Sequence, residues 1–471
     1  MLLELPPVIT RVVTGLREAG FRALVAGGAV RDVLLGLAPK DIDVEVYGIS
    51  FDRLAHFLQH YGRVDLVGKS FGVVKFTAAD AETCDFSLPR RDSKTGRGHR
   101  DFLAEFDEAI TPKEAASRRD FTINAMLFDL ERGEVLDFFG GQQDLKNLVL
   151  RATSDAFSED PLRVLRGMQF SCRFDLVLDE KTAEMSRAIA GEYDTLPRER
   201  VAEEFMKWAV KSVRPGRILE YLKQTGWIEH FPEIRKLEGV PQDPTWHPEG
   251  DVGTHTMHVV DAAARIAVRE QLGAEARAVL VFASLAHDFG KPATTELRNR
   301  EGKMRWTSWG HEPLGGPIAR QFLTRIGIKS TIVEQVVPMV ENHLTHHNAG
   351  ADVSRRAVRR LAMRLAPASI EQLILLIEAD ASGRPPRPTE VPAEAARILE
   401  AARAEAVAKE PMPPLILGRH VLPYFDGRAG KHIGEVTKAA YEAQVDGAFS
   451  TEEEALRWLA DYFIDARKAI Q

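Results

Sequence analysis

The spacing of hydrophobic and polar positions changes along the chain. In the first part, short apolar runs between turn residues predict strands near 63–67, 73–76 and 84–88. From Ser158 onward, apolar positions recur at helical spacing almost without interruption. The pattern predicts an α+β fold, with a mixed five-stranded sheet in a head of about residues 1–150 and helical domains after it.

The first strand-helix-strand unit carries the most distinctive chemistry. An apolar strand over 24–26 leads into the glycine pair 27–28 and a short helix, and the next strand carries Asp41 and Asp43. Strand side chains alternate with period two, so both carboxylates leave one face and can converge on a hard cation such as Mg²⁺. The glycines let backbone N–H groups approach a phosphate, and Arg31 adds positive charge. Together these features predict a site for a metal-bound triphosphate, whereas a lone glycine pair or Asp-x-Asp would indicate only a turn or a solvated strand end.

Later residues of the head extend this site. Asp85 is either a third carboxylate for the metal or a buried, hydrogen-bonded strand residue. Tandem arginines precede a helix expected near residue 121, and we expect Arg119 to bind phosphate, Arg118 to form a salt bridge and Asp120 to cap the helix. The basic, glycine-containing stretch 90–100 predicts a loop.

A helix start near residue 160 carries a second set of polar side chains. Ser158 is the expected N-cap and Pro161 lies in the first turn. Asp160, Arg163 and Arg166 are spaced three apart and share a helix face. They form either a structural ion pair or a group that hydrogen-bonds the edge of a nucleobase.

Two further charged helix faces are interpreted as structural. Arg200 and Glu204 are spaced i, i+4 and are expected to brace their own helix. The five arginines within 355–364 indicate a solvated helix face, with phosphate contact as the alternative.

A histidine- and aspartate-rich constellation occupies the middle of the chain. An adjacent His-Asp pair on an apolar helix, with a histidine upstream and an aspartate downstream, can surround a transition metal. The predicted ligands are His255, His287, Asp288 and Asp380. His311 and His343 would hold a second ion or contact phosphate. A metal-activated water there would make this part of the chain a phosphoester hydrolase.

Composition adds limits to this picture. At 471 residues the chain exceeds the roughly 250–300 residues at which a single core stops growing, which predicts several domains. Cys84 and Cys172 are too few for a disulfide framework and fit a reducing compartment. No apolar run is long enough to span a bilayer, so we expect a cytoplasmic protein without membrane contact. The net charge of −7 argues against a generally basic surface, although segregated basic stretches remain compatible with RNA binding.

The motifs resemble those of the bacterial tRNA nucleotidyltransferases, the class II CCA-adding enzymes of the polymerase β superfamily, and of their relatives the bacterial poly(A) polymerases. The resemblance covers nearly the whole chain, more weakly after about residue 390. It rests on Gly-Gly-Ala-Val-Arg-Asp (27–32), Asp-Ile-Asp (41–43), Arg-Arg-Asp-Phe-Thr-Ile-Asn-Ala (118–125), Glu-Asp-Pro-Leu-Arg (159–163), Glu-Arg-Val…Glu-Phe (199–205) and, for an HD phosphohydrolase domain, the segment 246–380.

The resemblance implies a role for each matching residue. Two aspartates would bind the catalytic Mg²⁺ ions, three residues would bind the triphosphate, and an acceptor-donor pair would read CTP and ATP: Asp41 and Asp43; Gly28, Arg31 and Arg119; Asp160 and Arg163, with Arg166 nearby. One acceptor and one donor can pair with the Watson–Crick edge of C or A, whereas G and U present a mismatched order. The 3′-hydroxyl of the tRNA would then attack the α-phosphate in line, releasing pyrophosphate.

The resemblance also implies which nucleotides are added. The segment from Pro89 to Ser117 has the length found in complete CCA-adding members, and members that add only CC have a shorter loop. The HD residues imply a divalent transition metal and a secondary phosphatase, 2′-nucleotidase or 2′,3′-cyclic phosphodiesterase activity, which would suit repair of damaged tRNA ends.

These expectations divide the chain into four domains. They are a nucleotidyltransferase head (1–150), a helical neck for nucleobase selection and RNA binding (151–235), an HD-type metal phosphohydrolase domain (236–390) and a helical C-terminal segment (391–471). Two alternatives stay open. The chain is a poly(A) polymerase or a partial, CC- or A-adding enzyme, or it is an HD phosphohydrolase whose head only binds RNA.

Overall fold

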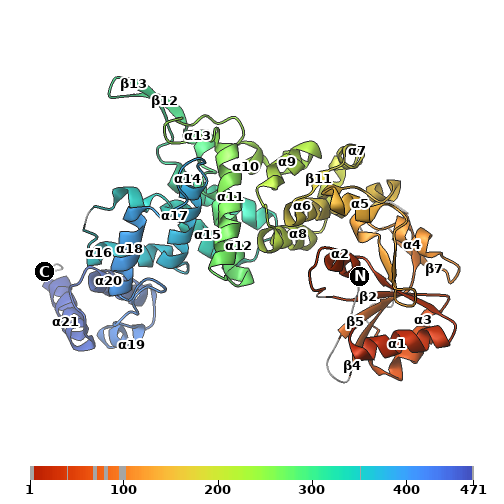
Figure 1. Ribbon diagram of the computed structural model, residues 1–471. Coiled ribbons are helices and arrows are strands. Elements are labelled where there is room, and N and C mark those ends of the chain that lie inside the picture. The colour runs from red at the N-terminus through yellow and green to blue at the C-terminus, as the bar shows by residue number, and fades with distance from the viewer. Residues whose placement is uncertain are drawn as a thin grey trace. The chain divides into compact units, whose positions relative to one another are not determined.

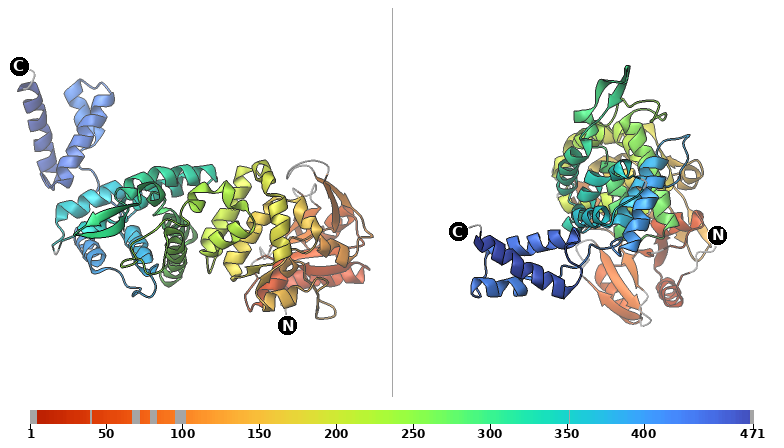
Figure 2. Two further views of the ribbon diagram at one scale, coloured as in Figure 1. Left: turned by 90° about the horizontal axis from the view of Figure 1, so that it is seen from above. Right: turned by 90° about the vertical axis from the view of Figure 1, so that its left-hand side faces the viewer.

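The chain folds as two compact units, Met1–Pro232 and Glu233–Gln471 (Figure 1). The structure is a computed structural model that describes residues 5–39, 41–66, 72–78, 83–94, 102–350 and 352–468, with the backbone alone for 90–94, 102–106 and 465–468. The first unit combines a sheet with helices, and the second is almost wholly helical (Figure 2). The predicted α+β class with a mainly helical remainder is therefore confirmed.

A mixed sheet forms the centre of the first unit. Its region contains α1 (Pro7–Glu18), β1 (Arg22–Ala26), α2 (Gly28–Leu34), β2 (Asp43–Tyr47), α3 (Phe51–Gln59), β3 (Gly62–Asp65), β4 (Val73–Ala78), β5 (Thr83–Ser87), β8 (Leu127–Asp129) and β9 (Glu134–Leu136). The strand order is β3-β4-β5-β2-β1-β8-β9, with only β2 and β5 parallel. The described sheet has seven strands where five were predicted, because β8 and β9 are three residues long and too short to show alternation.

The central strands bring the acidic residues to one end of the sheet. The last four residues of both β1 and β2 are buried, so these strands run through the core. Their register pairs Ala26 with Asp43, and the parallel pairing of β2 with β5 sets Asp43 beside Asp85. Asp41 precedes β2 and is not part of it, contrary to the sequence prediction.

A ribbon and a capped helix follow the sheet. The ribbon consists of β6 (Arg90–Lys94) and β7 (Phe102–Phe106), which pair antiparallel, so the stretch predicted as a loop begins as a strand. The rest of that stretch, residues 95–100, lies outside the described residues. Helix α4 (Pro112–Ser117) begins with a capping box in which Thr111 and Glu114 each bind the other's backbone N–H.

Helices complete the first unit. They and two short strands are α5 (Gly141–Lys146), β10 (Val149–Leu150), α6 (Leu162–Phe174), β11 (Val177–Leu178), α7 (Glu180–Ala188), α8 (Arg198–Lys211) and α9 (Arg217–Gln224), and α10 (Pro232–Arg235) follows. Helix α6 packs against α8 and α9. Its start differs from the prediction, because Ser158 lies in the 3₁₀ segment η3 (Asp155–Glu159) and the Asp160 carboxylate accepts a hydrogen bond from Leu162 N at 3.0 Å. The parallel pair β10–β11 was not predicted.

The second unit is a helical bundle that carries one hairpin. Its elements are α11 (Val252–Arg269), α12 (Ala274–Ala286), α13 (Lys291–Thr294), β12 (Glu296–Arg300), β13 (Lys303–Thr307), α14 (His311–Arg325), α15 (Ser330–Asn342), α16 (Arg355–Leu365), α17 (Ile370–Ser382) and α18 (Ala393–Ala404). Helix α12 packs against α11, α15 and α17, and α14 packs against α15. The hairpin β12–β13, which was not predicted, projects from the helices (Figure 1). In the described part of the chain, no helix has both the length and the apolar character needed to cross a membrane.

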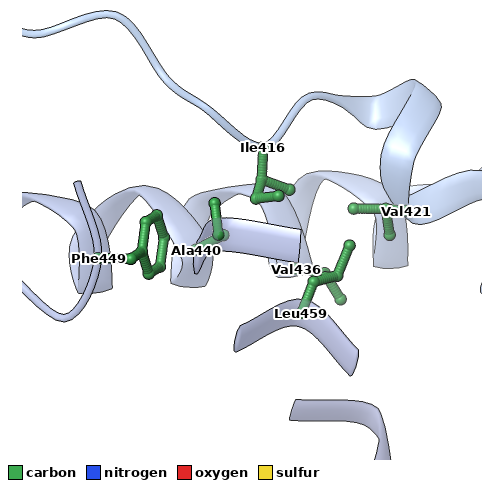
Figure 3. Close-up of a cluster of buried hydrophobic side chains, with 7 residues drawn as sticks. Ile416, Val421, Val436, Ala440, Phe449 and Leu459 are labelled. Carbon is green, nitrogen blue, oxygen red and sulfur yellow. The ribbon is translucent and has the colours of Figure 1, made fainter. Parts of the chain in front are cut away.

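The C-terminal helices have a hydrophobic core of their own. They are α19 (Gly418–Val421), α20 (Lys431–Val445) and α21 (Glu452–Lys468). Figure 3 shows their buried side chains, which include Ile416, Val421, Val436, Ala440, Phe449 and Leu459. Burial of these side chains from successive elements holds this segment together.

The arginine-rich helix α16 contacts the elements that follow it. Arg356 and Arg360 both bind the Asp446 carboxylate at the end of α20, with contacts of 2.7 to 2.8 Å. Arg359 binds Glu405, just after α18, at 2.6 Å. The arginines of 355–364 were expected to be a solvated face or a phosphate contact. Arg355, Arg356 and Arg360 are exposed, in agreement with a solvated face, and they also pair with carboxylates of other elements.

Candidate active sites

Four aspartates of the first unit line one cavity. Asp41, Asp43, Asp65 and Asp85 border a space of about 350 Å³ beside β2, β3, β4 and β5. Burial raises the pKa of Asp43, and the nearby Asp85 and Asp41 carboxylates raise it further while Arg119 opposes them. Among the described residues, the groups of ligand atoms that lie within 4.8 Å of one another are all in the second unit, so these aspartates are more widely spaced. Carboxylates that repel one another are nevertheless the donor set that a hard divalent cation neutralises.

A basic cleft opens on the other side of Asp43. The cleft has a volume of about 470 Å³ and is bordered by nine basic and three acidic side chains, of which Asp43 is one. The six residues expected to bind the nucleotide all line it: Gly28, Arg31, Arg119, Asp160, Arg163 and Arg166. Asp43 thus belongs to both cavities, whereas Asp41 lines only the acidic one. The positive charge of the cleft can bind a polyanion, and the neighbouring carboxylates can bind a cation that accompanies the polyanion.

A network around the glycine turn fixes two of the arginines. Arg119 Nη2 donates to Glu45 Oε1 at 2.6 Å, and the Tyr47 hydroxyl donates to Glu45 Oε2 at 2.6 Å. Burial alone would lower the pKa of Arg119, but Glu45 raises it, so the guanidinium stays charged. Gly27 has φ of 68°, and a Cβ there would lie 2.5 Å from Arg119 Nη1. The turn therefore requires glycine both for its backbone and for the close approach of Arg119.

Arg31 is buried and is held by several neighbouring side chains. It is 4% exposed, donates to Asp32 at 2.6 and 2.8 Å and to the Asn124 side chain at 2.5 Å, and stacks on Phe174. Its guanidinium lines the cleft as a fixed charge whose position the surrounding side chains set.

The residues at the start of α6 bind the preceding backbone. Arg163 donates to the carbonyl oxygens of Ala156 at 2.7 Å and Arg118 at 2.8 Å, which ties α6 to the segment before it. Arg118 itself pairs with Glu159 at 3.0 Å, in agreement with its predicted structural role. Arg163 uses two terminal nitrogens in this way, and it shares the cleft with Asp160.

Asp120 is a buried partner of Arg166. Its Oδ2 accepts from Arg166 Nε at 2.8 Å, and its Oδ1 accepts from Asn124 Nδ2 at 3.0 Å and from Phe121 N at 2.8 Å. The predicted helix after Asp120 is only the 3₁₀ turn η2 (Thr122–Asn124), so the capping prediction was wrong. Burial would raise the pKa of Asp120, but Arg166 and Asn124 lower it, and the carboxylate fixes the Arg166 guanidinium in the cleft.

The structure adds cleft residues that the sequence pattern did not single out. Asn124, Arg173, Arg200, Lys207 and Lys211 also line it. Arg200 pairs with Glu203 at 3.5 Å, and the buried Glu204 pairs with Lys207 at 2.7 Å, so the predicted Arg200–Glu204 brace was wrong. Glu45 was also missed, although its i, i+2 spacing from Asp43 places it on the same strand face, and that spacing was visible in the sequence.

Two groups of ligand atoms lie in the second unit around Asp288. One contains His255, His287 and Asp380, and the other contains Asp288, His311 and His343. His255 Nε2 is 3.0 Å from Asp380 Oδ1, and His311 Nε2 is 3.3 Å from His343 Nε2. The four predicted ligands come together, and the structure also brings in the two histidines suggested for a second ion.

Asp288 lies between the two groups. Its Oδ2 is 3.1 Å from His287 Nε2, and its Oδ1 is 3.3 Å from His311 Nε2. The residue is 1% exposed, and neither oxygen receives an aligned hydrogen bond from a described residue, although Lys291 Nζ lies 2.8 Å from Oδ2. A buried carboxylate with an oxygen turned toward each group fits a bridging ligand for two cations.

The ligand histidines are oriented through their other ring nitrogen. The Nδ1 atoms of His287, His311 and His343 each lie 2.7 Å from a backbone carbonyl oxygen three residues earlier. His255 Nδ1 lies 2.8 Å from the buried Glu249 carboxylate. This pattern fixes the tautomer that leaves Nε2 unprotonated, which is the usual arrangement of metal-binding histidines.

Burial and charge favour the metal-binding protonation state at His343 and Asp380, whereas burial would lower the pKa of His255 but the Asp380 and Glu249 carboxylates raise it. Burial lowers the pKa of His343 well below its usual range, and the adjacent His311 and His287 lower it further. Burial would raise the pKa of Asp380, but Arg384, whose Nη2 lies 2.7 Å away, and His255 lower it well below its usual range. Neutral imidazole and ionised carboxylate are the ligand forms.

The cluster forms one wall of a cavity of about 650 Å³. Asp288, His311, His343 and Asp380 border the cavity together with the cationic side chains of Lys291 and Arg384. Gly290 is needed at this wall, because a Cβ there would lie 2.1 Å from the carbonyl oxygen of His311. The cavity has the size of a small-ligand site, and Lys291 and Arg384 are the cationic side chains that could contact an anion next to the ligand atoms.

Comparisons with known proteins identify a family for the region of each site. Residues 23–151 match the family described as the poly A polymerase head domain, and residues 252–391 match the HD domain. A multifunctional CCA protein from Xanthomonas campestris pv. campestris is 36% identical over 370 residues, covering 76% of this chain and 85% of that protein.

Solved structures share the fold. The Bacillus stearothermophilus CCA-adding enzyme in complex with CTP has a TM-score of 0.63 and 18% identity, covering 99% of this chain and 100% of that one. The Thermotoga maritima CCA-adding enzyme complexed with tRNA has a TM-score of 0.55 and 19% identity, covering 98% of this chain and 96% of that one. With the curated relative spanning most of both sequences, the chain belongs to the family of the multifunctional CCA proteins.

Proposed function

We propose that this protein adds CCA to the 3′ end of tRNA without a nucleic-acid template, using CTP and ATP. The observation that carries the proposal is the position of Asp43, which borders both the acidic cavity and the basic cleft lined by all six expected nucleotide-binding residues. Relatives named as multifunctional CCA proteins and the similarity to a CCA-adding enzyme bound to tRNA support this choice of substrates.

Asp41 and Asp43 would hold Mg²⁺, and Asp85 is a further carboxylate of the same cavity, beside Asp43 in the sheet. When bound, the metal would polarise the α-phosphate and favour ionisation of the attacking hydroxyl. Gly28, Arg31 and Arg119 would bind and orient the triphosphate in the cleft. Fixed cationic side chains would balance the charge of the departing pyrophosphate.

In this proposal, residues at the start of α6 select the nucleobase. Asp160 supplies an acceptor and Arg163 a donor in the same cleft, and Arg166 is fixed beside them by Asp120. Arg163 has five N–H groups and uses only its two terminal nitrogens on the described carbonyl oxygens, so its Nε–H is a candidate donor toward a base. Small reorientations of these side chains would accommodate either C or A.

The head function is tested by Asp43→Asn, with Asp65→Asn as the matched control on the same acidic cavity. We expect Asp43→Asn to lower nucleotide incorporation into tRNA lacking its 3′ end by at least about 1,000-fold, and Asp65→Asn to leave it within about threefold. Unchanged incorporation in Asp43→Asn would favour the alternative in which the head only binds RNA.

We further propose a phosphohydrolase activity for the second unit. His255, His287, Asp288 and Asp380 would hold a divalent transition metal, and His311 and His343 would complete a second position that shares Asp288. Bound metal would supply an activated water for attack on a phosphoester, while Lys291 and Arg384 would orient the substrate phosphate.

The hydrolase proposal is tested with 2′-AMP and with adenosine 2′,3′-cyclic phosphate. Hydrolysis is measured after loading the protein separately with Mg²⁺, Mn²⁺, Co²⁺ and Ni²⁺. We expect a transition metal to support cleavage in the wild type and Asp288→Asn to abolish it. Absence of cleavage with all four metals would refute this second function and leave the head function untouched.

The four-domain division follows from these roles. The head (1–150) would perform transfer, the neck (151–235) would select the base and contact RNA, residues 236–390 would form the HD domain, and residues 391–471 would contact RNA or serve as scaffold. We also propose that the protein acts on its tRNA substrate in the cytoplasm.

A further inference from the structure

The cavity of the HD site has an aromatic side that the hydrolytic chemistry does not use. Three tryptophans line it together with the ligand cluster: Trp246, Trp306 and Trp309. They are 55%, 37% and 58% exposed, whereas most tryptophan surface in a folded protein is buried. Three exposed indoles on the wall of one cavity are an apolar surface of the kind that binds a ligand.

The hairpin β12–β13 and the segment before α11 are tied together on this side. Arg305 of β13 donates to Asp243 at 3.2 Å, and the Asp243 carbonyl oxygen accepts from Trp246 N at 3.0 Å and His247 N at 2.9 Å. The hydroxyls of Thr295 and Ser308 lie 2.8 Å apart and close the base of the hairpin. The aromatic side is therefore held in place and is not a set of independent surface residues.

Two of the tryptophans already have cationic partners. Arg298 and Arg300 lie 4.5 and 5.2 Å from the Trp309 ring centroid, and Arg387 lies 5.3 Å from that of Trp246. Within the described residues, no aromatic ring or guanidinium stacks on the indole of Trp306. Trp306 is 37% exposed and lines the cavity, so a planar ligand stacking on it would displace no aromatic or cationic partner among the described residues.

We propose that Trp306 is a nucleobase-stacking residue of the HD site, so that this site takes a nucleotide and not a bare phosphate ester. The inference rests on the proposed hydrolase function and adds the class of substrate that this site prefers. The phosphate would lie toward Asp288, Lys291 and Arg384, and the base would stack on Trp306 at the hairpin side of the same cavity. Stacking on an aromatic ring accepts any base, because every base has a π face.

The test compares 2′-AMP with glycerol 2-phosphate. Both are phosphate monoesters of a secondary alcohol, and only 2′-AMP has a base. We expect Trp306→Ala to raise KM for 2′-AMP by about 10- to 100-fold with kcat within about threefold, and to leave KM for glycerol 2-phosphate unchanged. Trp306→Phe should restore most of the affinity, because a phenyl ring also stacks.

Met304→Ala is the matched control. Met304 is 59% exposed, lies two residues before Trp306 on the same face of β13 and does not line the cavity. It should change neither KM, which would separate loss of stacking from loosening of the hairpin. A Trp306→Ala variant that weakens both substrates equally, or neither, would overturn the proposal.

A binding measurement keeps the inference separate from hydrolysis. Stacking of an adenine quenches indole fluorescence, so 2′-AMP should quench wild-type fluorescence and quench Trp306→Phe much less, while calorimetry shows both proteins binding it. If no metal supports cleavage but this difference in quenching is present, the stacking role stands and the hydrolase proposal fails. Equal quenching of both proteins would overturn the stacking role.

Discussion

Glu45 is predicted to hold in place Arg119, the arginine that we propose binds the triphosphate. Its carboxylate accepts from Arg119 on one oxygen and from Tyr47 on the other, both at 2.6 Å. At an effective dielectric constant of about 20, a unit charge pair at this distance attracts by about 6 kcal/mol before desolvation is subtracted. Removing one partner of a buried pair costs about 3–5 kcal/mol, and exposures of 24% for Arg119 and 11% for Glu45 place this pair near the lower end.

The variant Glu45→Ala should therefore destabilise the centre of the sheet by about 3 kcal/mol. Hydrogen exchange of the β1 and β2 amides would then be about 100-fold faster, since each 1.4 kcal/mol is a factor of ten. KM for CTP should rise about tenfold, because Arg119 loses the acceptor that orients it.

Tyr47→Phe is the matched control for this prediction. It removes one hydrogen bond to Glu45 and keeps the pairing with Arg119. We expect exchange less than about tenfold faster and an unchanged KM for CTP. Glu45→Ala with wild-type exchange and wild-type KM would refute the reasoning that Glu45 positions Arg119.

Two other predictions concern the metal cluster and acid stability. Asp288→Asn should reduce the bound transition metal, measured by elemental analysis, to one ion or none per chain. Nucleotide incorporation should stay within about twofold, because Asp288 lies in the second unit. Retention of two ions would contradict the proposal that Asp288 is shared by both metal positions. The lowered pKa of Asp120 means that the folded state holds this carboxylate ionised to a lower pH than the unfolded state does. Its stabilisation is fully present above the ordinary value of 3.8 and is lost as pH falls through the lower native pKa, so the stability gap between wild type and Asp120→Asn should close below pH 3.8. A gap that persists undiminished at the acid end would show that the Asp120–Arg166 contact contributes through something other than this ionisation.

Short-range patterns in the sequence predicted the framework of both sites. The Asp41-x-Asp43 spacing, the glycine turn and the later Asp160-x-x-Arg163 spacing indicated residues of the acidic cavity and the basic cleft, because each lies within a few consecutive residues of the chain. The His-Asp pair at the end of α12 identified the second site for the same reason. These features are local, so no knowledge of the tertiary packing was needed.

What the sequence could not predict depends on distant contacts. The sequence left Asp85 open between a third metal carboxylate and a buried strand residue, because its position beside Asp43 depends on the pairing of β5 with β2. Glu45 was missed because it binds Arg119 across 74 positions of the chain. At the start of α6, Asp160 and not Ser158 accepts the hydrogen bond from Leu162 N, because Ser158 lies in a 3₁₀ segment that precedes the helix. The ion pairs of the α16 arginines could not be predicted because their partners, Glu405 and Asp446, come much later in the sequence.

The most direct test of the central claim is the sequence of the product end. The wild-type protein is incubated with tRNA lacking its 3′ CCA, with CTP alone, ATP alone and both together, and the 3′ ends are sequenced. The account predicts two C residues with CTP alone and complete CCA, with no further extension, when both nucleotides are present. Addition that ends at CC with both nucleotides, or long A tails on this and unrelated RNAs, would contradict it.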